Sequence, residues 1–129
     1  MIVLDASVAL ELVLKTDRSI RWADLVFENE LHTPHLIDVE TLHVLRRMAL
    51  ARMITEREAE EAIQELQDMP LFRHPHWPLL SDIWDLRQSL TGYDASYVAL
   101  AGALDIPLFT CDAKLSRSHG HVVKIVLLE

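Results

Sequence analysis

The sequence predicts an α/β protein, a three-layer α/β/α domain with a mainly parallel central sheet. Residues 2–4 (Ile-Val-Leu) form an apolar run without polar alternation, which is typical of a short strand buried on both faces. Segments with strand and helix periodicity then alternate along the chain, which favours parallel strands joined by right-handed crossovers. Such crossovers bring the carboxyl ends of the strands to one edge of the sheet.

The predicted elements follow one another closely. We expect helices over residues 6–14, 18–29, 38–52, 55–68, 79–90 and 94–104, strands over residues 31–34, 107–110 and 122–128, and a strand or loop over residues 70–78. Asp38 is a candidate N-cap, and Thr55 with Glu58 has the spacing of a capping box. The helix over residues 94–104 is apolar almost all round, which indicates deep packing.

Length and composition favour one globular domain over residues 1–129, with half of the residues hydrophobic and a quarter charged. No apolar run approaches the ~20 residues that a membrane-spanning helix needs, and the N-terminus lacks the basic segment of a signal peptide. The single cysteine, Cys111, excludes an internal disulfide and fits a reducing compartment. We therefore expect a cytoplasmic protein without membrane contact.

The charge balance limits the function classes. A net charge of −8 argues against a protein that coats nucleic acid through bulk charge. The same net charge is compatible with an enzyme that has a local basic groove, or with a site whose acidic residues are neutralised by a metal ion. The sequence contains three glycines and neither the G-x-x-x-x-G-K nor the G-x-G-x-x-G pattern, so a Gly-rich phosphate loop is excluded.

Four acidic residues lie at junctions between predicted elements that face one edge of the sheet. Asp5 follows the first strand, Glu40 lies near the start of the helix after the second strand, Asp94 begins the apolar helix and Asp112 follows the strand at residues 107–110. Taken singly, each acid also fits a helix-capping, helix-dipole or turn role. The predicted architecture brings all four together, which favours a shared site.

Electrostatics indicates what such a site needs. Two carboxylates ~5 Å apart repel by roughly 3 kcal/mol at an effective dielectric constant of ~20. Four of them stay ionised only with a partner, and a hard divalent cation supplies one. Oxygen ligands without a nearby thiolate or paired imidazoles suit Mg²⁺ or Mn²⁺, which activate water and stabilise charge on a phosphodiester.

The sequence resembles the PIN domain family, and within it the VapC toxins of bacterial toxin–antitoxin pairs. The resemblance covers essentially the whole chain and is carried by residues 2–7, 38–40, 90–101 and 109–112. Its most specific part is the segment Tyr-Asp-Ala-x-Tyr-Val-Ala-Leu-Ala at residues 93–101. The resemblance implies a Mg²⁺- or Mn²⁺-dependent endoribonuclease that cleaves RNA, forms a homodimer and is held inactive by a cognate antitoxin.

The resemblance also implies roles for particular residues. The residues that match the acidic quartet of the family, and would act in catalysis and metal binding, are Asp5, Glu40, Asp94 and Asp112. Ser7 and Thr110 match hydroxyl positions that support it. Some PIN domains carry a further acid just after the position of Asp94, where this chain has Ser96 and Tyr97. We therefore expect one tightly held ion rather than two.

Weaker candidates come from basic and histidine-containing segments. Arg87 precedes Asp94 by two turns and is a candidate phosphate contact. The stretch from residue 113 to 124 is locally basic and is the candidate RNA-contacting surface, with a solvated loop as the alternative; it contains Lys114, Arg117, His119, His121 and Lys124. The segment His74-Pro75-His76 invites a metal assignment, but surface histidines are the commoner case.

Two other function classes share this layout. Phosphotransfer by an aspartate, as in phosphatases of the haloacid dehalogenase type or response-regulator receivers, requires acidic or lysine partners that this chain lacks near Asp5. A non-catalytic interaction module with a degenerate acidic site is the third possibility, and the intact quartet argues against it.

Overall fold

The computed structural model describes residues 1–129 and contains a five-stranded sheet in which every pairing is parallel. The strand order is β3-β2-β1-β4-β5. The strands are β1 (Ile2–Leu4), β2 (Leu31–Pro34), β3 (Leu71–His74), β4 (Leu108–Thr110) and β5 (Ile125–Leu127). The predicted parallel sheet is confirmed, the undecided segment before residue 78 contains an edge strand, and the last strand is shorter than expected.

Strand β1 occupies the centre of the sheet, and its burial confirms the prediction from its sequence. All three of its residues are buried, and the strand pairs with β2 on one side and β4 on the other. A continuous Ile-Val-Leu run suits this place because both faces of a central parallel strand are covered by helices. The carboxyl ends of β1 and β4 therefore lie side by side, with Asp5 and Asp112 just beyond them.

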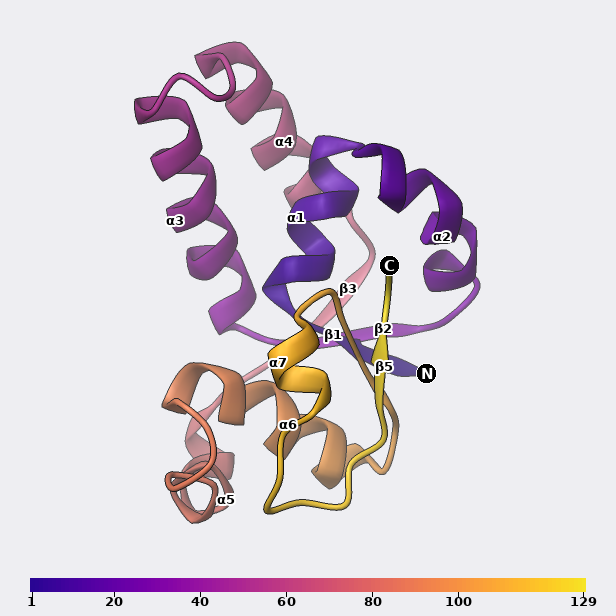
Figure 1. Cartoon of the computed structure of the whole chain (residues 1–129), viewed down its shortest axis with the longest axis vertical. Helices are drawn as coiled ribbons and strands as arrows, with labels where there is room; N and C mark the ends of the chain where they lie inside the picture. Colours follow the sequence, from indigo (N-terminus) through magenta and orange to yellow (C-terminus); the bar gives the residue numbers. More distant parts are fainter.

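Seven α-helices form the two outer layers (Figure 1). They are α1 (Ala6–Leu14), α2 (Asp17–Phe27), α3 (Leu36–Leu50), α4 (Glu56–Asp68), α5 (Leu80–Asp85), α6 (Gly92–Leu104) and the short α7 (Ala113–Ser116). Helix α1 packs against α2, α3 and α4 on one side of the sheet, and α6 packs against β1, β2 and α5 on the other. No helix is long and apolar enough to cross a bilayer.

Helix α6 is buried as predicted. Its residues 95–101 are all buried, and three of them are alanines that allow close approach to the sheet. Thr91 caps the helix by accepting a hydrogen bond from the Asp94 amide, so Gly92 begins this helix. The cap holds Asp94 at the edge of the sheet where the strands end.

The helix predicted over residues 38–52 begins two residues earlier, so the N-cap role expected for Asp38 is wrong. His35 precedes α3 and makes no side-chain capping bond. The Asp38 carboxylate instead accepts hydrogen bonds from Nε and Nη2 of Arg73, at 2.8 and 2.9 Å. This contact joins α3 to the edge strand β3, and local spacing alone cannot reveal such a pair.

The helix predicted over residues 79–90 is confirmed in its first half and wrong in its second. A 3₁₀ turn at Trp77–Leu79 leads into α5, which ends at Asp85, and hydrogen-bonded turns follow up to Leu90. The polar residues 87–89 offer no apolar face for a helix to bury. Helix α7 was not expected at all, because a helix of four residues shows no periodicity.

The capping box at the start of α4 is confirmed. The Glu58 amide donates to Thr55 Oγ1 at 3.0 Å, and the Thr55 amide donates to the Glu58 carboxylate at 3.1 Å. Thr55→Ala is expected to lower the free energy of unfolding by about 1 kcal/mol, measured by urea denaturation. Ser81→Ala, at an exposed position on α5, is the control and should change little.

Candidate active site

The four predicted acids, here called the acidic cluster, all lie at helix beginnings on the carboxyl edge of the sheet. Asp5 caps α1, Asp112 caps α7, Asp94 lies in the first turn of α6, and Glu40 is the fifth residue of α3. Asp5 and Asp112 therefore each cap a helix and also belong to the acidic cluster. Helix N-termini carry partial positive charge, which favours carboxylates here.

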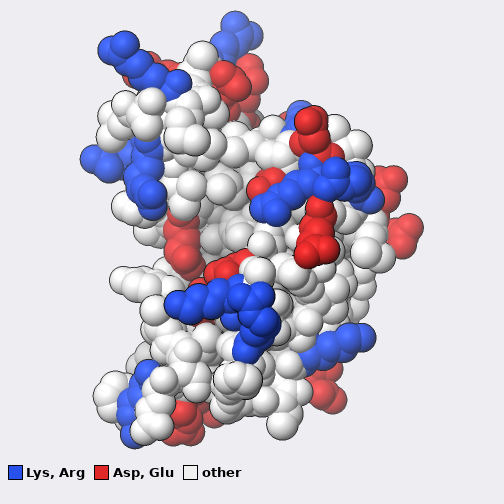
Figure 2. Space-filling model, in the orientation of Figure 1, with Lys and Arg blue, Asp and Glu red and all other residues white.

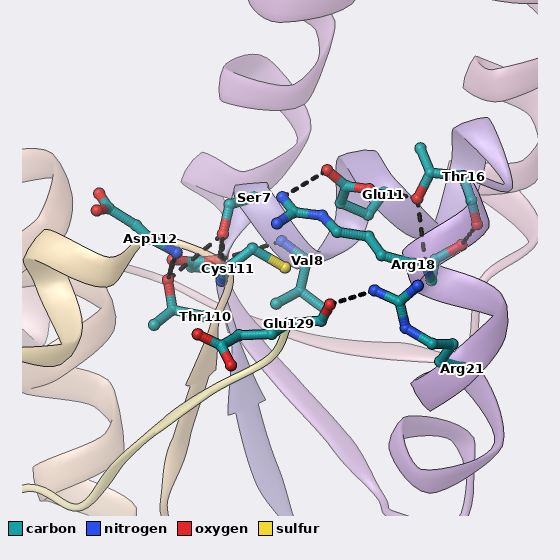
Figure 3. A network of polar contacts seen from close by, with 12 residues as sticks. Ser7, Val8, Glu11, Thr16, Arg18, Arg21, Thr110, Cys111, Asp112 and Glu129 are labelled. Atoms are coloured by element: carbon teal, nitrogen blue, oxygen red, sulfur yellow. Dashed lines mark hydrogen bonds and ion pairs between the residues drawn. The ribbon is translucent and has the colours of Figure 1, made fainter.

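Asp5 is the most constrained member of the cluster. Its Oδ1 accepts hydrogen bonds from Ser7 Oγ at 2.5 Å and from the Val8 amide at 3.2 Å. Its Oδ2 accepts a hydrogen bond from Thr110 Oγ1 at 2.5 Å. Ser7 and Thr110, predicted as supporting hydroxyls, are thus both brought to Asp5 (Figure 3).

The same hydroxyls tie the end of β1 to the loop after β4. Ser7 Oγ accepts a hydrogen bond from the Cys111 amide at 2.9 Å, and Thr110 Oγ1 accepts one from the Asp112 amide at 3.0 Å. Each hydroxyl donates to Asp5 and accepts from the backbone, which fixes its orientation. The position of Asp112 is therefore set through the hydroxyls that hold Asp5.

Burial makes the charge of Asp5 costly. Only 5% of the residue is exposed, and desolvation raises the pKa of Asp5 from 3.8 to about 6, although its three hydrogen bonds act the other way. The negative charge of Asp94 adds to the increase. A nearby cation would therefore stabilise the charged form of this carboxylate.

Glu40 is held by Tyr97, a residue that the sequence analysis quoted in a motif but did not assign to the site. Tyr97 Oη donates to Glu40 Oε1 at 2.7 Å, and Tyr97 is almost fully buried. Burial, followed by the charge of Glu40, keeps the pKa of Tyr97 far above its usual value, so the phenol remains a donor. The sequence signal that could have assigned Tyr97 to the site is its spacing. Tyr97 follows Asp94 by three residues, which puts both side chains on one face of the helix.

Asp94 links the cluster electrostatically. Its charge raises the pKa of both Asp5 and Glu40 in addition to the larger effect of burial. The pKa of Asp94 is itself raised, first by burial and then by the charge of Asp112, while Lys114 partly offsets this. Asp94 therefore repels each of the other three carboxylates.

The donor set of the cluster fits a hard divalent ion such as Mg²⁺ or Mn²⁺. All four side chains offer carboxylate oxygens, and burial together with repulsion involving Asp94 raises the pKa of Asp5, Glu40 and Asp94. No three His, Cys, Asp or Glu side chains stand close enough to enclose an ion directly. Water molecules between carboxylate and ion, which Mg²⁺ usually retains, are consistent with this spacing.

A cavity of about 900 Å³ opens beside Asp94 and Asp112. Its wall includes three members of the predicted basic stretch, namely Lys114, Arg117 and His119. On this face of the molecule, basic side chains gather over α7 and acidic atoms lie next to them (Figure 2). The sheet edge therefore combines negative carboxylates with a local positive wall, although the whole protein is acidic.

Other candidate residues lie elsewhere. Arg87 does not line this cavity, because its guanidinium lies over the Trp84 ring at 4.7 Å and donates to the Trp84 carbonyl. Lys124 precedes β5 and thus lies toward the amino ends of the strands, away from the acidic cluster.

Ser96 Oγ donates back to the Gly92 carbonyl at 2.7 Å. Burial raises the pKa of Cys111 to about 11, so its thiol is no nucleophile at neutral pH.

The histidines near residue 74 join two strands rather than forming a metal centre. His74 Nε2 and His32 Nδ1 are 2.8 Å apart and hydrogen-bonded, and His32 Nε2 lies 2.7 Å from Glu30 Oε1. His76 Nε2 accepts a hydrogen bond from the Leu36 amide. One ring nitrogen of His74 and one of His76 thus have a protein partner.

Tyr97→Phe is expected to lower the rate of the reaction at this site by about 10- to 100-fold, because Glu40 loses the donor that orients it. The free energy of unfolding should fall by only about 1 kcal/mol. The rate is measured as kcat, and stability by thermal unfolding. Tyr93→Phe, at an exposed position one turn earlier, is the control. Equal rates for the two variants would contradict the role given to the Tyr97 hydroxyl.

Comparison with known proteins places this geometry in context. The chain matches the PIN domain over residues 2–119. Ribonuclease VapC12 of Mycobacterium tuberculosis is 37% identical over 128 residues, covering 99% of each chain. Ribonuclease VapC1 of the same organism is 43% identical over 105 residues, covering 81% of this chain and 79% of the relative. The crystal structure of VapBC2 from Rickettsia felis, bound to a DNA fragment from its promoter, shares the fold with a TM-score of 0.68 at 14% identity, covering 100% of both chains.

Proposed function

This chain belongs to the PIN domain family and, within it, to the VapC ribonucleases, and from this membership we propose that it is the endoribonuclease toxin of a toxin–antitoxin pair. The observation that carries the proposal is the acidic cluster: four carboxylates, in which Asp94 repels each of the other three, beside a cavity with basic side chains. A cluster of this kind suits a metal-assisted attack of water on a phosphodiester.

Each carboxylate has a proposed role. Asp5, Asp94 and Asp112 would hold one Mg²⁺ or Mn²⁺ ion, at least in part through water, and the ion would supply an activated water and charge neutralisation at the phosphate. Glu40, oriented by Tyr97, ligates the same ion or orients the attacking water. Ser7 and Thr110 hold Asp5 so that its carboxylate cannot rotate away. The expected products carry a 5′-phosphate and a 3′-hydroxyl.

The substrate is RNA, held in part by the wall of the cavity. Lys114 and Arg117 are exposed there and neutralise backbone phosphates near Asp94 and Asp112. Arg87 contributes to substrate binding only if its side chain leaves Trp84, on which it now packs. The cleavage chemistry therefore depends on the cluster, and the hold on RNA depends on cations around it.

The partners include a cognate antitoxin and a second copy of the chain. The VapBC2 complex of Rickettsia felis has the same fold as this chain, and a partner of that kind is expected here. Surface residues near α5 offer an apolar contact, since Trp77, Leu80 and Trp84 are 75, 60 and 65% exposed. Because the proposed substrate is RNA and the proposed partner is an antitoxin, we expect the activity in the cytoplasm.

Phosphotransfer through Asp5 has less support than nuclease activity. Both oxygens of its carboxylate accept hydrogen bonds, and the residue is nearly inaccessible. A nucleophile must reach the phosphorus atom, and this carboxylate is not free to do so. Acid-labile phosphorylation of Asp5 would nonetheless restore this alternative.

Metal removal tests the proposal. The purified chain, freed of antitoxin and treated with EDTA, is expected to lose RNA cleavage and to regain it with Mg²⁺ or Mn²⁺. Calorimetric titration with Mn²⁺ should show one tight site per chain, because Ser96 and Tyr97 stand where a further acid would be needed. Cleavage that persists in EDTA contradicts metal dependence, and two tight sites contradict the single ion. RNA ends sequenced after induction identify the target.

A further inference from the structure

Arg18 projects from the first turn of α2 toward the acidic cluster because the turn between α1 and α2 is short. Lys15 ends α1 in the left-handed region with φ 52°, and Thr16 immediately caps α2. Helix α2 therefore starts beside α1. The side chain of Arg18 runs back across α1 toward Ser7 and Cys111 (Figure 3).

Glu11 determines where the guanidinium of Arg18 lies. Arg18 Nη2 donates to Glu11 Oε1 at 2.7 Å, and Thr16 Oγ1 donates to the other carboxylate oxygen. Burial alone would raise the pKa of Glu11, but the bonds from Arg18 and Thr16 outweigh it and lower that pKa. An ion pair of this exposure adds little to stability. Its main consequence is to orient the cation.

The guanidinium remains available to a ligand. A guanidinium has five N–H donors, and Arg18 makes one side-chain hydrogen bond, to Glu11. Its side chain is 40% exposed, against 17% for Glu11. Figure 3 shows the Arg18 side chain extending toward Cys111, in the loop that connects Thr110 to Asp112, and the charge of Arg18 acts on the Cys111 thiol.

Basic side chains lie on both sides of the acidic cluster. Those of α7 line the cavity next to Asp94 and Asp112. Others gather over α2 on the same face of the molecule, with acidic atoms between the two groups (Figure 2). Arg18 belongs to the α2 group and is the member that donates to Glu11, a residue of α1.

We infer that Arg18, oriented by Glu11, binds an RNA backbone phosphate on the side of the acidic cluster opposite Lys114 and Arg117. This inference rests on the proposed ribonuclease function and adds a second contact to it, so that RNA is gripped on both sides of the bond that is cleaved. A planar guanidinium matches the oxygens of a phosphate with two parallel hydrogen bonds. Free donors on Arg18 make this geometry accessible.

Arg18→Gln tests the inference, with Arg21→Gln as the matched control. Glutamine keeps an amide that can donate to Glu11 but removes the charge. Arg21 lies on the same helix and bonds the Glu129 carbonyl instead of Glu11. For cleavage of a fluorescein-labelled single-stranded RNA with Mn²⁺, Arg18→Gln should raise KM about tenfold while kcat changes little. In EDTA, the binding constant for the same RNA should fall less steeply with salt concentration. The slope of its logarithm against the logarithm of salt concentration should be smaller in magnitude by about 0.7 than for the wild type.

The outcomes separate this inference from the proposed function. Equal KM and equal salt slope for Arg18→Gln and Arg21→Gln overturn the role of Arg18, while cleavage by the wild type still supports a ribonuclease. Binding with an Arg18-dependent slope but no cleavage supports Arg18 and overturns the ribonuclease. Absence of RNA binding by the wild type overturns both. If Arg18→Gln does not fold, Arg18→Lys takes its place, and a smaller rise in KM with an unchanged salt slope is expected.

Discussion

Replacing Asp94 with asparagine is expected to lower RNA cleavage by about 1000-fold or more, while the metal-free protein becomes at least as stable as the wild type. Asp94 is the carboxylate whose charge acts on Asp5 and Glu40, and it is acted on by Asp112. Removing it takes away a proposed metal ligand, which costs several kcal/mol of transition-state stabilisation. It also removes the central repulsion in the cluster, which together with burial outweighs the attraction of Asp94 to Lys114, since the net effect on the pKa of Asp94 is a rise.

The measurement combines kcat for RNA cleavage with thermal unfolding in EDTA. Asp24→Asn is the matched control, because Asp24 is exposed on α2 and lies outside the cluster. It should leave both quantities unchanged. A clearly lower melting temperature for metal-free Asp94→Asn would show that Asp94 serves the N-terminus of α6 rather than a cation site. Full activity in Asp94→Asn would remove the basis of the proposed function.

Metal-free protein is expected to lose stability as pH rises through the titration of Asp5. The Asp5 carboxyl group has a pKa of about 6 in the folded chain, and its ordinary value of 3.8 stands for the unfolded chain. Between these two pH values the folded chain keeps a proton that the unfolded chain has released. The neutral form favours the fold, and this contribution is complete at low pH. Between about pH 4 and pH 6 it disappears, with a loss of about 3 kcal/mol.

Asp5→Asn should remove this loss. Asparagine caps helices as well as aspartate does, and its amide can accept from Ser7 and donate to Thr110. We expect the variant to exceed the wild type in free energy of unfolding by about 1 to 3 kcal/mol at pH 8, and by little at pH 4. Urea denaturation in EDTA at both pH values measures the difference. Groups other than Asp94, whose charge interacts with that of Asp5, titrate equally in both proteins, so a difference independent of pH would contradict the assignment to Asp5.

Much of the fold was predictable because its signals are local. The Ile-Val-Leu run predicted a buried central strand, and Thr55 with Glu58 predicted the start of α4. The end of α5 and the presence of α7 were not predictable, since segments this short carry no periodicity. Asp38 was misassigned because Arg73, which holds it, lies 35 residues away in sequence.

The sequence by itself determined which acids stand at the ends of which elements, and the parallel topology then brought Asp5, Glu40, Asp94 and Asp112 to one edge. Only the tertiary structure decided how each is held. Asp5 is buried between a hydroxyl from α1 and one from β4, Glu40 is oriented by a tyrosine from another helix, and Arg18 is oriented by Glu11. Burial and long-range hydrogen bonds set the charge state and direction of these groups, and both depend on neighbours that only folding supplies.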